Sequence, residues 1–149
     1  MATIDVDNGY AYRGKGSVRT MGAYVKDLFR LKFKSIGERT HVITGNKKDP
    51  FNYYKFQKRV CTKHAVPLRY FALCGNKGEH DHGLDITSIS FKKLVKKLRF
   101  SGKVGIHPSY LSNSDPKLLK DEVRLLSKIL RKRVIHSRQH FLKLKFPVT

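Results

Sequence analysis

Four polar side chains stand where they can act together on a metal ion or a proton. Asp5 and Asp7 are two residues apart in one short apolar segment, so on a strand their side chains point to the same side. Paired carboxylates bind a divalent cation, or one of them keeps a proton and serves as an acid or base. His107 ends a second apolar segment and Arg138 ends a third. Imidazole binds metals or accepts protons, and a guanidinium holds a carboxylate or an anionic substrate group.

The elements that must position these residues are short apolar runs separated by helical patterns. The runs cover residues 3–7, 69–75, 104–107 and 134–138. Alternating strands and helices predict the α/β class, with about four parallel strands and flanking helices. Chemistry in such sheets and barrels sits at the carboxyl ends of the strands. The carboxylates, the histidine and the arginine all fall at those ends, which favours an enzyme-like, metal-centred site.

Helix signals fill the spaces between the runs. Apolar residues at helical spacing predict two helices. Ser17 can cap the first, whose apolar positions are Val18, Met21, Val25, Leu28 and Phe29, and the second has a stripe of Phe91, Leu94, Val95 and Leu98. Asp49-Pro50 and Asp115-Pro116 are typical of a helix start, with an acid at the N-cap and proline after it. The first of these helices is expected to reach about His64. Residues 34–48 are polar and contain glycine, and we expect a loop there.

Each candidate also has a plainer interpretation. Acidic residues commonly end strands, His107 can be held by loop backbone alone, and Arg138 can be a surface arginine. His80 and His82 flank Asp81 in a long loop, where such a pair more often faces solvent than binds metal. The two cysteines show no metal spacing, and Cys74 ends an apolar run, which favours a buried core thiol over a nucleophile.

Length and charge restrict the class of protein. A chain of 149 residues predicts one domain over residues 1–149. The net charge of +21 favours nonspecific attraction to polyanions, including nucleic acid, anionic glycans and anionic membrane surfaces, although lysines solvated on helix faces are an equal alternative. A basic nucleic-acid-binding protein is therefore one candidate function, but RNP, helix-turn-helix and zinc-finger patterns are absent. No stretch is long enough to span a membrane, and the first strand leaves no room for a signal peptide, so we expect a cytoplasmic protein.

Several segments together resemble a known family. They are residues 3–12 with 14–16, residues 49–51, residues 70–71 with Gly75, residues 105–110 and residues 137–142. These segments resemble NodB-type polysaccharide deacetylases, and most of all the bacterial polysaccharide deacetylase-like branch. The similarity spans essentially the whole chain, and its last two motifs are specific in combination.

The resemblance implies a distorted (β/α) barrel with a divalent metal, usually zinc, held by one aspartate and two histidines. A second aspartate acts there as the general base for a metal-bound water that attacks the N-acetyl carbonyl of a glycan. By the same resemblance Asp5 matches the base and Asp7 the metal-binding aspartate. His107 matches the first metal histidine, and Arg138 matches the arginine that orients the base.

The chain departs from the family pattern in two places. Leu111 stands where the second metal histidine is expected, and His140 or His82 would have to replace it. The later family motifs, including the histidine that acts as catalytic acid, would lie beyond Thr149. We therefore expect a partial barrel, since a closed one needs about eight strands. An incomplete deacetylase acting on acetylated glycans is the first interpretation, and a non-catalytic remnant or fragment of the fold is the second. An open sheet edge would favour self-association.

Overall fold

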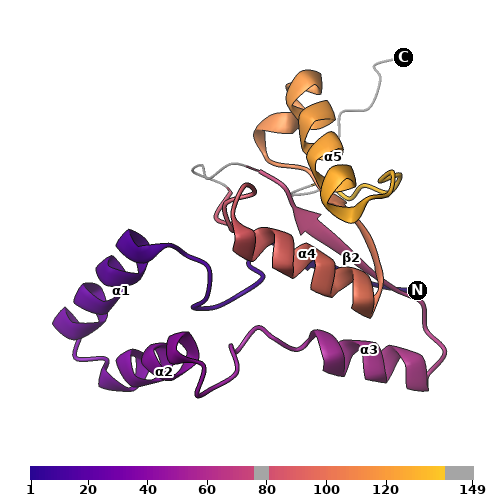
Figure 1. Ribbon diagram of the computed structural model, residues 1–149. Coiled ribbons are helices and arrows are strands. Elements are labelled where there is room, and N and C mark those ends of the chain that lie inside the picture. Colours follow the sequence, from indigo (N-terminus) through magenta and orange to yellow (C-terminus); the bar gives the residue numbers. More distant parts are fainter. Residues whose placement is uncertain (76–80, 140–149) are drawn as a thin grey trace, which may run out of the picture. The chain divides into compact units, whose positions relative to one another are not determined.

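Three short strands form a parallel sheet in the order β1-β2-β3 (Figure 1). The computed structural model describes residues 1–75 and 81–139. Within them, β1 is Ala2–Val6, β2 is Leu68–Leu73 and β3 is Lys103–His107. Both pairings are parallel, so the carboxyl ends of all three strands lie at the same edge of the sheet. The predicted α/β class is confirmed at this level.

The burial of the strands follows their order. Tyr70, Phe71, Ala72 and Leu73 are all buried, as expected for a central strand covered on both faces. The edge strand β1 instead alternates, with Val6 buried and Asp5 exposed. A strand with one polar side can therefore present carboxylates at its end without burying them.

Five α-helices and one 3-10 turn are present in the described residues. They are α1 (Ser17–Phe29), α2 (Phe33–Thr44), α3 (Tyr54–Lys63), α4 (Ile89–Ser101), η1 (Leu111–Asn113) and α5 (Pro116–Leu130). The chain divides into two units, each described by itself. The sheet unit comprises Met1–Gly9 and Tyr53–Thr149, and the hairpin unit is Tyr10–Asn52.

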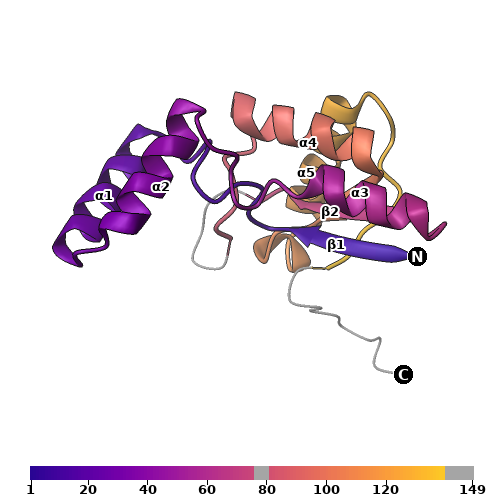
Figure 2. The same ribbon diagram turned by 90° about the horizontal axis from the view of Figure 1, so that it is seen from below.

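Helices α3 and α4 lie side by side over one face of the sheet (Figure 2). The buried stripe of α4 consists of Phe91, Leu94, Val95 and Leu98, and the Tyr54 ring of α3 meets Tyr70 of β2 edge to face at 5.8 Å. Helix α5 begins as predicted, because Asp115 Oδ1 accepts the N–H groups of Lys117 and Leu118 and Pro116 follows the cap. Helix α4 thus packs against β2 and β3, and α5 packs against α4.

Two local predictions for the hairpin unit are wrong. Residues 34–48 are not a loop, because α2 occupies Phe33–Thr44. Its apolar periodicity is weak, with only Val42 buried, so the pattern carried little helical signal. The helix predicted from Asp49-Pro50 begins only at Tyr54.

Asp49 binds the backbone of a neighbouring loop instead of capping a helix. Its carboxylate is buried and accepts backbone N–H groups from Ala11, Tyr12, Arg13 and Phe51 at 2.8–3.2 Å. Burial alone would raise the pKa of Asp49, but these four donors outweigh it, and the pKa lies below its ordinary value. Asp49 therefore organises the loop over residues 11–13.

Replacing Asp49 with asparagine should release this loop. A carboxylate whose pKa is lowered in the folded state adds stability above its unfolded pKa of about 4, and that stability is lost as the pH falls through the folded value. We expect the amides of residues 11–13 to lose protection, relative to their intrinsic exchange rates at the same pH, in Asp49→Asn at pH 7 and in the wild type as the pH drops below about 4. Asp115→Asn is the matched control, because it changes an aspartate at a distant cap. Equal exchange in both variants would contradict this role.

The fourth predicted strand is reduced to a single bridge. Ser137 pairs in parallel with Ile106, and two backbone bonds join the segments: Ile106 N donates to His136 O at 2.9 Å, and Arg138 N donates to Ile106 O at 3.0 Å. The prediction of a strand over residues 134–138 is thus wrong in extent but right in placement. One bridge is enough to bring Arg138 to the carboxyl end of β3.

The two cysteines differ in exposure. Cys74 is fully buried and Cys61 only partly so. Burial, with a smaller effect of the Glu122 charge, raises the pKa of the Cys74 thiol far above its usual value. We expect a thiol-alkylating reagent to modify Cys61 alone in the native chain and both cysteines in denaturant. Mass spectrometry of the native adduct provides the measurement, and modification of Cys74 before Cys61 would contradict the described core.

No helix in the described part of the chain is long and apolar enough to cross a membrane.

Candidate active site

Asp7 and His107 meet at the carboxyl edge of the sheet. His107 is the last residue of β3 and is 4% exposed, whereas Asp7 follows the end of β1. Asp7 Oδ1 lies 3.4 Å from His107 Nε2, and 49% of the Asp7 side chain is exposed. The pair therefore joins a fixed, buried imidazole to a carboxylate that opens to solvent.

Backbone contacts fix the tautomer of the His107 ring. Nδ1 lies 2.6 Å from the carbonyl oxygen of Arg138, and a carbonyl only accepts hydrogen bonds. Nδ1 therefore carries a proton, and in the neutral ring Nε2 directs its lone pair toward Asp7. A histidine that ligates a metal is typically held in this way by a second group on its other nitrogen.

The spacing of the two atoms is compatible with two ligands on one metal ion. A charged imidazolium–carboxylate hydrogen bond has a length of about 2.7–2.9 Å, well below the observed 3.4 Å. Two ligand atoms on a tetrahedral zinc ion, each about 2.1 Å from it, lie about 3.4 Å apart. One nitrogen and one oxygen are also donors that zinc accepts.

The carboxylate of Asp5 forms an ion pair with the guanidinium group of Arg138. The Arg138 Nε lies 3.4 Å from Asp5 Oδ2, and its NH1 group donates to Thr3 Oγ1 at 2.9 Å. The side chains of Arg138 and Asp5 are each about one-third exposed, so their contact is open to solvent. Arg138 thus serves twice: its backbone holds His107, and its guanidinium holds Asp5.

The loop after β3 is fixed by two buried carboxylates that sequence analysis did not assign to the site. Glu122 of α5 accepts the N–H of Ser109 at 3.1 Å, and Asp81 accepts the N–H of Tyr110 at 3.1 Å. Both acids are nearly inaccessible. Burial raises the pKa of Glu122, and the Asp81 charge adds to this effect. Together they hold the chain that follows His107.

A sequence signal for Glu122 did exist. It is an acid within the apolar stripe of α5, and a charged residue in such a position must find buried partners. Asp81 gave a weaker signal, because it lies in a polar, glycine-containing loop that was expected to face solvent.

The other candidate positions are either exposed or outside the described residues. His82 is exposed, and Leu111, at the position of the expected second histidine, is 66% exposed. His80 and His140 lie outside the described residues. Within residues 1–75 and 81–139, no group of three or more His, Cys, Asp or Glu side chains is arranged to hold a metal ion. The described donors are therefore two, Asp7 and His107.

In comparisons with known proteins, no family model, no curated protein and no solved structure matches the chain.

Proposed function

We propose that this chain carries part of the machinery of a metal-dependent, polysaccharide deacetylase-like hydrolase that removes N-acetyl groups from a glycan. The observation that carries the proposal is the Asp7–His107 pair, 3.4 Å apart and with the histidine tautomer set by a backbone carbonyl. The resemblance of the motif residues to NodB-type deacetylases supports the same assignment. In that reading the sheet is part of a (β/α) barrel, with the site at its carboxyl end.

Asp5 is the proposed general base. Asp5 is an exposed residue of β1, two residues before Asp7, and its carboxylate is paired with Arg138. The pairing orients the carboxylate, which as a general base would accept a proton from an attacking water. Arg138 is a positioning residue in this scheme, because it acts through Asp5 and His107.

Asp7 and His107 are the proposed metal ligands, and zinc fits their donor atoms best. A bound zinc ion would lower the pKa of a water and polarise an acyl carbonyl. Two protein ligands bind zinc more weakly than the usual three, so the described residues predict a weak and exchangeable metal.

The proposed function is tested with two substrates that differ in their leaving group. Amide hydrolysis needs an acid to protonate the departing amine, whereas an aryl acetate releases a phenolate that needs no such help. The described site offers a base and two ligands but no identified acid. We therefore expect zinc to stimulate hydrolysis of p-nitrophenyl acetate, with little or no acetate released from chito-oligosaccharides.

Each outcome decides a part of the proposal. Absence of zinc-stimulated aryl acetate hydrolysis would reject the catalytic assignment and favour a non-catalytic remnant of the fold. Robust acetate release from chito-oligosaccharides, lost in Asp5→Asn, would show that the chain is a complete enzyme and that an acid has been missed.

A further inference from the structure

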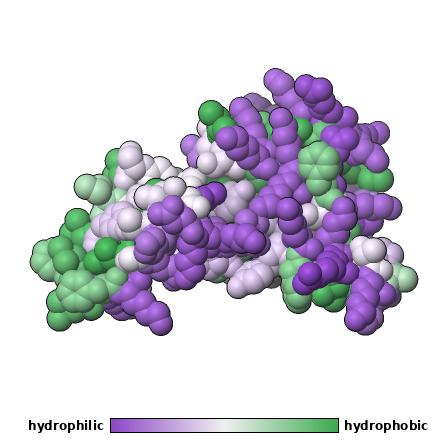
Figure 3. All heavy atoms as spheres, turned by 60° about the horizontal axis from the view of Figure 1, so that its bottom comes forward, coloured by the Kyte–Doolittle hydropathy of each residue, from purple (hydrophilic) through white to green (hydrophobic). Residues whose placement is uncertain are grey.

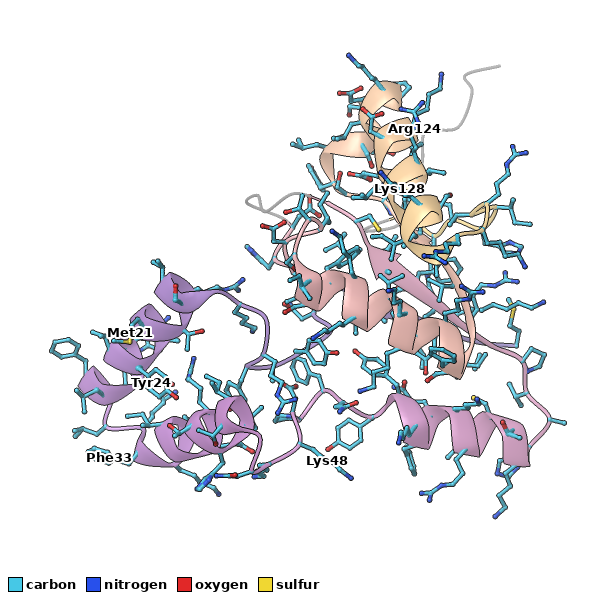
Figure 4. All side chains as sticks on the ribbon, viewed as in Figure 1. Met21, Tyr24, Phe33, Lys48, Arg124 and Lys128 are labelled. Carbon is cyan, nitrogen blue, oxygen red and sulfur yellow. The ribbon has the colours of Figure 1, made fainter. Side chains whose placement is uncertain are left out.

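Helix α1 turns its polar side toward its neighbour and its apolar side outward. Tyr24 Oη lies 2.9 Å from Thr40 Oγ1 of α2, and Arg39 of α2 pairs with Asp27 (Figure 4). No residue of α1 is buried. The outward stripe of α1 consists of Val18, Met21, Val25, Leu28 and Phe29, which are 50–87% exposed. An amphipathic helix normally buries such a stripe, so we expect the stripe of α1 to contact a partner outside the hairpin unit.

The stripe continues into a tip of alternating apolar and basic residues. The tip is residues 29–34, where Phe29, Leu31 and Phe33 are 84%, 73% and 63% exposed. The intervening residues Arg30, Lys32 and Lys34 are exposed as well. Figure 3 shows the hydrophobic atoms gathered at this end of the hairpin unit with hydrophilic ones beside them. Leu31 has a φ of 51°, an unfavourable backbone conformation for a bulky residue.

The positive charge of the tip is only partly balanced within the hairpin unit. This unit contains ten Lys and Arg residues but only three acids. Asp27 pairs with Arg39, Glu38 pairs with Lys47 and interacts more weakly with Lys34 of the tip, and Asp49 accepts backbone N–H groups. A partner for the tip must therefore accept both cations and large apolar side chains.

We propose that the outward stripe and the tip dock on an anionic lipid bilayer. Phe and Leu side chains insert at the boundary between headgroups and acyl chains, while interleaved Lys and Arg contact anionic headgroups. A second copy of the chain fits less well, because the two tips would bring like charges together. Nucleic acid would satisfy the cations but would leave the aliphatic stripe in water.

Vesicle sedimentation of the full chain tests this directly. We expect binding to vesicles of equal parts phosphatidylcholine and phosphatidylglycerol, and much weaker binding to phosphatidylcholine alone. Phe29→Ser with Phe33→Ser should reduce binding about tenfold or more. The matched control is Phe56→Ser with Phe100→Ser, which removes two exposed aromatic residues of the sheet unit and should leave binding unchanged.

A charge-reversal pair separates docking by the tip from general polyanion attraction. Arg30→Glu with Lys32→Glu should lower binding about tenfold or more, since each basic residue near the surface contributes about 1 kcal/mol. Lys120→Glu with Lys128→Glu changes the same charge on α5 (Figure 4) and should have a much smaller effect. Equal losses in the two pairs would overturn the proposal in favour of nonspecific attraction.

A fluorescence reporter then locates the contact. The chain has no tryptophan, so Phe29→Trp introduces a single reporter at the tip. Its emission should shift to the blue when phosphatidylglycerol vesicles are added, whereas the emission of Phe100→Trp should not. A blue shift that follows protein concentration without vesicles would instead show that a second copy covers the tip. That outcome, or no shift at all, would overturn the proposal.

Discussion

Replacing Gly105 with alanine is expected to destabilise the chain by about 3 kcal/mol. A Cβ at this position would lie 2.7 Å from the carbonyl oxygen of His136 and 2.7 Å from the Phe71 ring. Contacts this short force the segment over residues 136–138 away from β3. The two backbone hydrogen bonds that join this segment to Ile106 would then break.

The same substitution should also damage the candidate site. The carbonyl of Arg138 holds His107 Nδ1, and the Arg138 side chain holds Asp5, so displacing this segment frees both groups. Urea unfolding measures the loss of stability, and the His107 ring signals in an NMR spectrum report the loss of the backbone contact. Gly37→Ala is the matched control, because nothing lies within 4 Å of its added Cβ in α2. It should be neutral or stabilising by up to about 1 kcal/mol. Wild-type stability of Gly105→Ala would contradict the described approach of residues 136–138.

Asp5→Asn is expected to lower zinc-stimulated hydrolysis of an aryl acetate about 100-fold or more. The asparagine amide does not accept the proton of an attacking water at neutral pH. The substitution also removes the negative charge that pairs with Arg138. Zinc affinity should stay close to that of the wild type, because Asp5 is assigned as the base and not as a ligand. A loss of rate without a loss of zinc affinity would distinguish the role of Asp5 from that of Asp7.

The matched control for this prediction is Asp121→Asn. Asp121 is an exposed aspartate of α5 that pairs with Arg124 at 3.0 Å. The same chemical change there should leave the rate unaltered. An Asp5→Asn variant that keeps the wild-type rate would remove Asp5 from the mechanism, whatever the metal does.

The strand ends were the most predictable part of this molecule. Three of the four short apolar runs ended in a polar side chain, and parallel pairing brings such ends to one edge, so pattern and topology predicted that Asp7 and His107 would meet. The start of α5 was equally plain, because Asp115 and Pro116 are both local signals.

Other features depended on contacts between residues distant in the sequence. Asp49 precedes a proline, as a helix-capping residue often does, but its carboxylate accepts the backbone N–H groups of residues 11–13. The segment over residues 134–138 has strand composition, but the structure shows it paired with β3 at one position only. Helix α2 was missed because its apolar residues are few and do not repeat at regular helical spacing. The double role of Arg138, through backbone and side chain, depends on a register that no pattern displays.

The proposed metal site at the carboxyl edge of the sheet consists of His107 and Asp7. Zinc titration of the full chain, followed by the NMR signals of the histidine side chains, tests it most directly. We predict that zinc shifts the Nε2 signal of His107 while Nδ1 remains protonated by its contact with Arg138, and that Asp7→Asn weakens this shift but His64→Ala does not. A titration in which zinc leaves the His107 ring unchanged would contradict the account.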